Sequence, residues 1–322
     1  MNKLEVIQHF ARNIIHFSSL EGKYFMTENN FDTVKNPDEV NSALKSVCRL
    51  KSNNITVLQK EELALIQFNN LLQYEDILAH AFTTRLGGVS SGECSSLNLS
   101  FNRNDSEKNV KSNYRIVADA LELDYSKIVL SNQVHDNKIF VVGEKDAGKG
   151  LTKESDILGY DGLITNCIGV PLVTFFADCV PVLMLDPENK AIAAVHSGWR
   201  STVRNISYEA VKLMQSEYGT KPEALVVAIG PSLCQQCFEV SKDVYEEFAN
   251  AFSFIEMFSE KIGDKYYISL QKVIRKILMD ANVKEENILI SDICTKCNND
   301  VFFSYRGDYQ KTGSLAAFMM LK

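Results

Sequence analysis

The chain has 322 residues, of which 45% are hydrophobic, and its 41 acidic and 34 basic residues give a formal net charge of -7. This composition supports a packed core and excludes a disordered chain, and an acidic chain without a run of Lys or Arg argues against nucleic acid as a partner. Eight cysteines are too few for a disulfide-stapled scaffold, no apolar stretch is long enough to span a membrane, and the charged N-terminus does not resemble a signal peptide. We therefore expect a cytoplasmic protein without a membrane partner, whose cysteines are thiols or metal ligands.

The chain divides into an N-terminal extension, residues 1–60, and a further domain over residues 61–322. The extension is expected to be helical in part, with a helix over Leu4 to Phe17. The domain alternates short apolar runs with helical periodicity, which predicts strands at 81–84, 138–142, 170–176, 180–185, 191–195, 224–229 and 301–304 and helices at 107–121, 202–217, 242–252 and 269–281. Because this order mixes hairpins with helical crossovers, we predict an α+β fold of mixed β-sheets covered by helices.

The segment ADCVPVLMLDPENKAIAAVHSGWR contains two apolar runs around a turn-forming set, Asp186 to Asn189, and so predicts a β-hairpin. If Asp186 pairs with Asn189, Cys179 lies opposite His196, with Cβ atoms about 4.5–5.5 Å apart. A thiolate and an imidazole are natural zinc ligands, and a catalytic zinc site has three protein ligands and one open position. A third ligand is therefore expected from elsewhere in the chain.

The third ligand is sought among the chain's histidines, of which there are five. His9 and His16 fall in the N-terminal helix and are weak candidates. His80 precedes the apolar run AFTT, and His135 lies in a polar loop before the run KIFVV. Ligands commonly gather where strands end in loops, so position favours His135 and leaves His80 open.

The motifs TTRLGGVSSGECSSLNLS, NQVHD, YDGLITN, ADCVPVLMLD, AVHSGWR, AIGP, CFEV and FFSYR occur in the order seen in one family. From about Ala79 to the C-terminus the chain resembles the laccase-domain family, which is labelled multicopper polyphenol oxidase and also purine nucleoside phosphorylase. The resemblance implies the laccase-domain fold and a laccase-like catalytic domain over residues 61–322. Carried over by motif, it implies that the metal ligands are His135, Cys179 and His196.

The same resemblance implies a Zn2+-dependent purine nucleoside phosphorylase that acts on adenosine, inosine, guanosine and 5'-methylthioadenosine and also deaminates adenosine. Zinc can activate water for attack on C6 of adenine, and Asp178, adjacent to Cys179, is a candidate proton shuttle. Phosphorolysis needs guanidinium donors for phosphate, for which the candidates are Arg85, Arg200 and Arg306.

Two positions depart from the family pattern. Ser201 follows GWR where Gly is more usual, and Ser314 follows TG where Arg is more usual. Both changes bear on anion binding rather than on the three proposed metal ligands.

A second pattern pairs Cys234-x-x-Cys237 with Cys294-x-x-Cys297. Two C-x-x-C pairs have the ligand types of a structural zinc site with four thiolates. The resemblance does not require these cysteines for catalysis, so a second metal and reduced thiols in neighbouring loops both remain open.

Three other functions compete with the zinc phosphorylase. Copper-dependent phenol oxidation is disfavoured, because its copper centres need many more histidines than five. A cysteine hydrolase would use Cys179 as nucleophile and His196 as base. A binding module stabilised by metal would use the same ligands without turnover.

Overall fold

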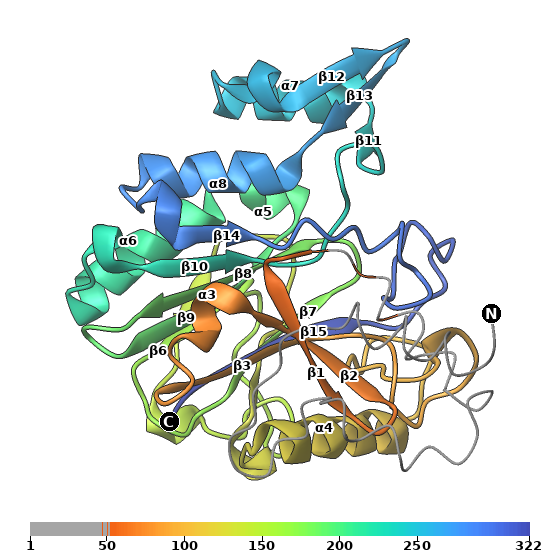
Figure 1. The fold of residues 1–322 in the computed structure, drawn as a ribbon, viewed down its shortest axis with the longest axis vertical. Helices are drawn as coiled ribbons and strands as arrows, with labels where there is room; N and C mark the ends of the chain where they lie inside the picture. The colour runs from red at the N-terminus through yellow and green to blue at the C-terminus, as the bar shows by residue number, and fades with distance from the viewer. Residues whose placement is uncertain (1–46, 48–49, 51) are drawn as a thin grey trace, which may run out of the picture.

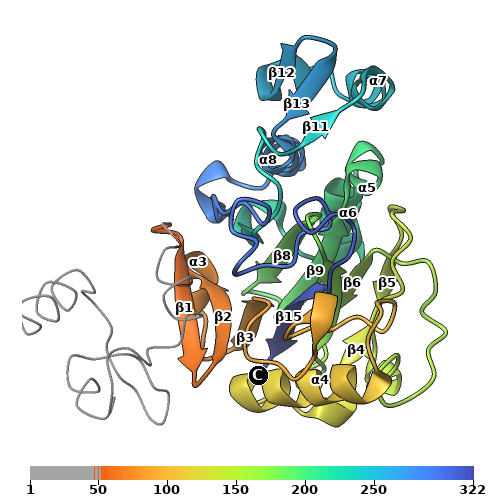
Figure 2. The ribbon, with the colours of Figure 1, turned by 90° about the vertical axis from the view of Figure 1, so that its right-hand side faces the viewer.

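The computed structural model describes residues 47, 50 and 52–322, so the helix expected over Leu4 to Phe17 lies outside the described residues. Two six-stranded sheets pack face to face, and helices cover their outer surfaces (Figures 1 and 2). The first sheet has the order β1 (Ile55–Lys60), β2 (Leu63–Phe68), β3 (Leu78–Thr83), β15 (Leu315–Leu321), β7 (Leu172–Phe176) and β4 (Val129–Leu130). The second has the order β14 (Ile288–Ile290), β10 (Val226–Ile229), β8 (Val180–Asp186), β9 (Ala191–Ser197), β6 (Gly162–Thr165) and β5 (Ile139–Val141).

Both large sheets are mixed. β4 runs parallel to β7, β10 to β14, and β5 to β6, while the other neighbours are antiparallel. The helices are α3 (Asn69–Leu72), α4 (Glu107–Leu121), α5 (Trp199–Val203), α6 (Ile206–Tyr218), α7 (Lys242–Ala251) and α8 (Leu270–Asp280). The predicted α+β fold of mixed sheets covered by helices is confirmed.

A small third sheet stands apart from the sandwich. Its order is β11 (Glu239–Val240), β13 (Lys265–Ile268) and β12 (Ser259–Ile262). Together with α7 it forms the projection at the top of Figure 1, beyond α8.

The central strands β3, β15, β8 and β9 are buried on both faces, which explains their continuous apolar runs. In β9, Ala191, Ala193 and Val195 pack toward α6 and α8, whereas Ile192 and Ala194 pack against the first sheet. Helix α4 covers the opposite face of the first sheet at the bottom of Figure 1. Three stacked apolar layers therefore hold the strand ends of both sheets in fixed positions.

Helix α4 has the bounds that its periodicity predicts. It begins after Ser106, whose side chain accepts a hydrogen bond from the Asn109 amide, and it ends at Glu122 in the left-handed conformation. The helix predicted over 202–217 is instead divided into α5 and α6, because Asn205 between them has a φ of 61°.

The strand predicted at 301–304 is wrong. The amides of Val301 and Phe302 both bond to the carbonyl of Asn298, which closes turns, and the side chains of Phe302 and Phe303 enter the core between the sheets. Those residues are therefore apolar because their side chains fill the core at a turn.

The hairpin β8–β9 forms, but its predicted register is wrong by two residues. Asp186 pairs with Ala191 instead of Asn189, because its carboxylate accepts the amides of Glu188 and Asn189 and so closes a longer turn. A shift of two residues leaves every side chain on its face, since strand side chains alternate with period two. His196 now pairs with Pro181, two residues from Cys179.

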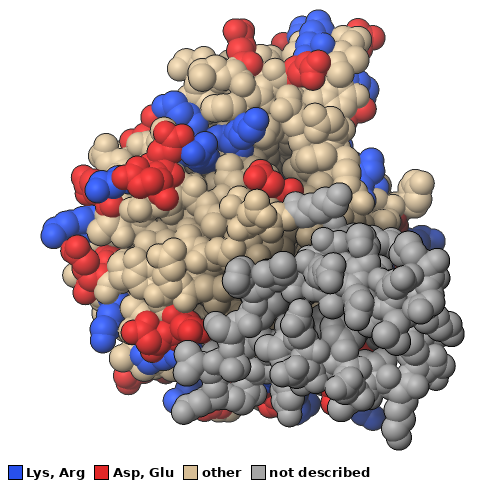
Figure 3. Space-filling model, in the orientation of Figure 1, with Lys and Arg blue, Asp and Glu red and all other residues tan. Residues whose placement is uncertain are grey.

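On the face shown in Figure 3, Lys and Arg side chains lie next to Asp and Glu mainly along the left and upper margins of the described surface, and most of its middle carries neither. No helix among the described residues is both long and apolar enough to cross a membrane.

Candidate metal centre

The structure brings His135, Cys179 and His196 together from three separate segments. His135 lies in the loop after β4, Cys179 directly precedes β8, and His196 lies in β9. One possible ligand atom from each falls within 4.8 Å of the other two. Sγ of Cys179 is 3.8 Å from Nε2 of His135, and the two imidazole rings stand nearly perpendicular, at 78°.

These three groups fit one metal ion. A tetrahedral zinc ion with bonds of about 2.3 Å to sulfur and about 2.1 Å to nitrogen keeps the two ligand atoms about 3.6 Å apart. The 3.8 Å between Cys179 and His135 matches that spacing without movement of the backbone. Three protein ligands would leave the fourth position open toward the cavity described below.

Asp161, directly before β6, orients the site from behind. It is fully buried, and its Oδ1 lies 2.7 Å from Nδ1 of His196. A hydrogen bond at Nδ1 leaves Nε2 of that ring free to bind a metal ion. The same carboxylate accepts the amides of Val134, His135 and Asp136, each at 2.9 Å. One carboxylate thus positions two of the three ligands.

The loop that carries His135 depends on these amide contacts. His135 has a φ of 63°, in the left-handed region that non-glycine residues rarely adopt. Three amides that converge on one carboxylate give that conformation a compensating set of charge-assisted hydrogen bonds. Asp161 therefore holds the loop as well as the ring of His196.

The pKa values of the buried Cys179 and His196 shift in the directions expected of an ion pair. Burial opposes ionisation of the thiol, but the neighbouring His196 charge and hydrogen bonds from both histidines outweigh it and lower the pKa of Cys179 to about 6. Burial likewise opposes the imidazolium, but the Cys179 thiolate and Asp161 raise the pKa of His196 to about 9. The site thus favours a thiolate, the form in which cysteine binds metal.

Gly198 allows the three segments to approach so closely. A Cβ atom at this position would lie 2.6 Å from Cδ2 of His135 and 3.2 Å from Sγ of Cys179. Any side chain there would push the two ligands apart.

The three ligands open into a cavity of about 610 Å³ between the sheets and the surrounding loops. This volume suits a small-molecule ligand. The lining is formed by Ser100, Phe101, Asn102, Arg103, Leu130, Ser131, Asn132, Gln133, His135, Gly150, Ser155, Leu158, Phe175, Phe176, Ala177, Cys179, His196, Tyr305 and Ser314. Arg103 is the one Lys or Arg among these described lining residues, and no Asp or Glu is among them.

None of the three arginines proposed to bind phosphate belongs to that lining. Arg85 donates to the carbonyls of Ser95 and Asn299. Arg306 donates to the carbonyls of Cys237 and Glu239. The exposed Arg200 stacks on its neighbour Trp199, with its Cζ 4.2 Å from the ring centroid. Their substrate-binding role stays a prediction.

Asp178 is next to Cys179, but its carboxylate is occupied by other partners. It accepts the hydroxyls of Thr295 and Ser304 and the amide of Arg306, at 2.6–2.7 Å. These contacts join the segment before β8 to the loop after β14. They suit a positioning residue, and the proton-shuttle role stays a prediction.

Comparisons with known proteins identify the family of the chain. A family model described as multi-copper polyphenol oxidoreductase laccase matches residues 79–322. The chain belongs to this family.

Two relatives and one solved structure show how far the laccase-family similarity extends. The purine nucleoside phosphorylase YlmD of Bacillus subtilis (strain 168) is 33% identical over 243 residues, which cover 75% of this chain and 87% of YlmD. Adenosine deaminase RL5, from an unknown prokaryotic organism, is 31% identical over 230 residues, covering 70% of this chain and 87% of RL5. The crystal structure of the Bacillus licheniformis hypothetical protein YfiH has a TM-score of 0.77 and 30% identity, and the match covers 84% of this chain and 100% of YfiH.

The histidines of this laccase-family chain do not fit a set of several copper centres. The whole sequence holds five histidines. His80, the alternative third ligand, is buried in the first sheet, where its Nε2 accepts the Phe68 amide at 2.9 Å. Only His135 and His196 of the described histidines therefore reach the cavity.

Two residues that position or line the laccase-family site were missed by sequence reasoning. Asp161 stands in the YDGLITN motif, where a charged residue before a buried strand signals a required partner. Arg103 carries no comparable signal, because its place beside the cavity depends on the contact of its Nε with the hydroxyl of Ser314, 2.9 Å away and distant in sequence.

Proposed function

We propose that this chain is a zinc-dependent purine nucleoside phosphorylase for adenosine, inosine, guanosine and 5'-methylthioadenosine that also deaminates adenosine. The observation that carries the proposal is the convergence of His135, Cys179 and His196 on the floor of a cavity large enough for a nucleoside. The names of the relatives, a purine nucleoside phosphorylase and an adenosine deaminase, favour this chemistry over other zinc reactions.

His135, Cys179 and His196 would hold the zinc ion, which supplies Lewis acidity that activates water or polarises a substrate atom when bound. Asp161 fixes the ring of His196 and the loop of His135, and it prevents either ligand from turning away. Asp178 fixes the backbone next to Cys179.

Arg103 is our candidate for binding phosphate. It is the cation of the lining, and its Nε bonds to Ser314, which leaves the two NH2 groups of the guanidinium for an anion. Its guanidinium lies 5.9 Å from the ring centroid of Tyr305, another lining residue. Ser314 stands where the family more often has Arg. Arg103 contacts Ser314 and so brings a guanidinium to the same part of the cavity.

The two reactions need different partners at the purine. In phosphorolysis a phosphate oxygen bonds to C1' of the ribose as the bond from C1' to N9 breaks, and the leaving base takes up a proton. In deamination water adds to C6 and ammonia leaves. Since no described lining residue is a carboxylate, the proton for the leaving base would come from solvent or from a cavity hydroxyl such as that of Tyr305.

The decisive experiment incubates zinc-loaded protein with adenosine, with and without phosphate, and separates adenine, inosine and hypoxanthine by chromatography. Adenine formed only with phosphate supports phosphorolysis, and inosine formed without phosphate supports deamination. The proposal is overturned if neither product forms with zinc-loaded protein, or if His135→Ala forms both at the unchanged rate.

A cysteine hydrolase with Cys179 as nucleophile and His196 as base is the second candidate, favoured by the approach of these two side chains to within 4.8 Å. His135, whose Nε2 lies 3.8 Å from Sγ of Cys179, is an alternative base. The two candidates differ in how zinc affects the thiol. Zinc binding should protect Cys179 from alkylation by iodoacetamide if the thiol is a ligand. Hydrolysis that proceeds in chelator and is abolished by alkylation of Cys179 would favour the hydrolase.

A further inference from the structure

Two cysteine pairs follow two neighbouring strands of the second sheet. Strands β10 and β14 are parallel, so the loops that follow them leave the same edge. The loop after β10 carries Cys234 and Cys237, and the loop after β14 carries Cys294 and Cys297. An isolated bridge between Ser232 and Cys294 holds the two loops in register. The fold therefore places two C-x-x-C segments side by side.

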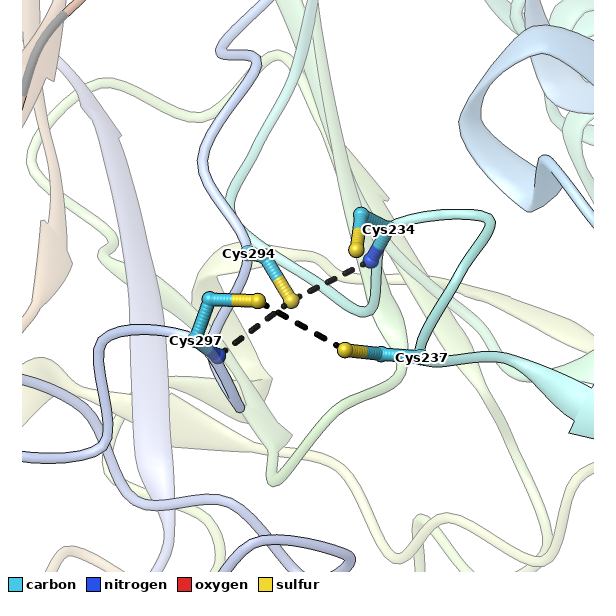
Figure 4. Close-up of side chains that lie close together, drawn as sticks. All are labelled: Cys234, Cys237, Cys294 and Cys297. Atoms are coloured by element: carbon cyan, nitrogen blue, oxygen red, sulfur yellow. Dashed lines mark hydrogen bonds between the residues drawn. The ribbon is translucent and has the colours of Figure 1, made fainter.

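The four thiols point toward a common centre (Figure 4). All four sulfur atoms lie within 4.8 Å of one another, and Sγ of Cys237 is 3.5 Å from Sγ of Cys297. A tetrahedral zinc ion with four bonds of about 2.3 Å separates its sulfur ligands by about 3.8 Å. Small movements of the side chains would therefore complete such a site.

Backbone amides also point at this cluster. The amides of Cys234 and Cys297 approach Sγ of Cys294 at 3.3 and 3.5 Å, as the dashed lines in Figure 4 show. These two amides hold the Cys294 side chain within the cluster. Cys294 is buried, Cys234 and Cys237 are half-buried, and Cys297 is exposed, so an ion can enter from the side of Cys297.

We propose that Cys234, Cys237, Cys294 and Cys297 bind a second zinc ion as four thiolates. Four protein ligands close the coordination sphere, which is typical of a structural site and leaves no position for substrate. This ion is separate from the one proposed at His135, Cys179 and His196. The second site can therefore be tested independently of the phosphorylase activity.

The second ion would fix one wall of the cavity. The loop that carries Cys294 continues through Thr295, Ser304 and Arg306, which together bind the carboxylate of Asp178, and through Tyr305, which lines the cavity. The ion would therefore join the loop after β10 to the segment that holds the backbone next to Cys179. Its loss should loosen this wall and lower stability without removal of the catalytic ligands.

The test counts zinc in protein purified with a thiol reductant, by elemental analysis and by native mass spectrometry. We expect two zinc ions per chain in the unaltered protein and in the control Cys167→Ser, which replaces a cysteine outside both clusters. The double variant Cys234→Ser, Cys237→Ser and the double variant His135→Ala, Cys179→Ala should each retain one ion. Cobalt loading should give the intense visible bands of coordination by four thiolates, which the His135 double variant keeps, whereas the cysteine double variant retains only the weaker bands of the site with the single thiolate of Cys179.

One zinc per chain in the unaltered protein, lost with the His135 double variant, would overturn the proposal. Retention of two ions by the cysteine double variant would also overturn it. A disulfide between Cys237 and Cys297 in protein purified with the thiol reductant would do the same. If the cysteine double variant does not fold, the count in the unaltered protein and in the His135 double variant decides. A His135 double variant that keeps one ion but has no phosphorylase activity supports the second site, whatever reaction the first site performs.

Discussion

Oδ1 of Asp161 accepts both the Nδ1 proton of His196 and the backbone amide of His135, at 2.7 and 2.9 Å. A single buried oxygen atom therefore connects a histidine in a central strand to a histidine in a loop with a left-handed backbone. Burial disfavours the charged carboxylate, but hydrogen bonds from His196 and the loop amides outweigh it and keep the pKa of Asp161 below its usual value.

Replacement of this carboxylate should weaken zinc binding while every direct ligand stays in place. In Asp161→Asn, the side-chain NH2 group would face the amides of Val134 and Asp136, which donate to a carboxylate oxygen in the unaltered protein. We expect zinc affinity to fall by about 10–100-fold, measured by competition with a chromophoric chelator. Asp156→Asn, at an exposed carboxylate, is the matched control and should leave affinity unchanged.

Removal of zinc should abolish both reactions together. Protein treated with chelator should form neither adenine nor inosine from adenosine, and added zinc should restore both in proportion to the ion bound at His135, Cys179 and His196. The assay follows both products across a zinc titration. Recovery of one activity alone would show that the two reactions do not share this site.

Arg103 should separate the two reactions. In Arg103→Ala, the KM for phosphate should rise at least about tenfold, since one charge-assisted contact contributes about 1.5–3 kcal/mol. The deamination rate should change little, because that reaction uses no phosphate. Arg200→Ala is the comparison: a larger rise in the KM for phosphate in this variant would return the phosphate site to the exposed arginine on α5.

His80 should make stability depend on pH. Burial lowers the pKa of His80 from 6.5 to about 3, while Nε2 accepts the Phe68 amide. His80 therefore binds a proton near pH 6.5 in the unfolded chain, but only near pH 3 in the folded chain. Stability falls as pH drops through this window, because the proton binds preferentially to the unfolded chain. Between pH 7 and pH 5 this group should reduce the free energy of unfolding by about 2 kcal/mol.

The control for that prediction is His80→Gln, which keeps an acceptor near the Phe68 amide and does not titrate. Urea unfolding at both pH values should show a smaller loss for the variant than for the unaltered protein. Equal losses would mean that other groups account for the acid sensitivity.

The sequence predicted the parts of the fold that depend on local pattern. Helix α4 has the predicted bounds because Val110, Tyr114 and Val117 recur at helical spacing and Ser106 caps its start. The hairpin was predicted from its turn residues, but its register was not, because the side chain of Asp186 closes a longer turn than the predicted one. The approach of Cys179 to His196 survived that error because the shift was an even number of residues.

The parts that failed depend on contacts between distant segments. The run at 301–304 is as apolar as a strand, but Phe302 and Phe303 fill the core from a turn, and burial alone does not distinguish the two. The cavity arginine could not be chosen by motif, because Arg103 reaches the cavity through Ser314, 211 positions later in the chain. Side-chain partners at such separation follow from the packing of the two sheets.

The close approach at Gly198 has a consequence for how this centre can vary. Because only a hydrogen atom fits between the backbone at Gly198 and the ring of His135, any side chain at this position would change the spacing of the ligands. A change of metal preference is then more accessible through substitution of a ligand itself than through enlargement of a neighbouring residue. Libraries that seek altered metal selectivity should leave this glycine fixed and vary the cavity side instead.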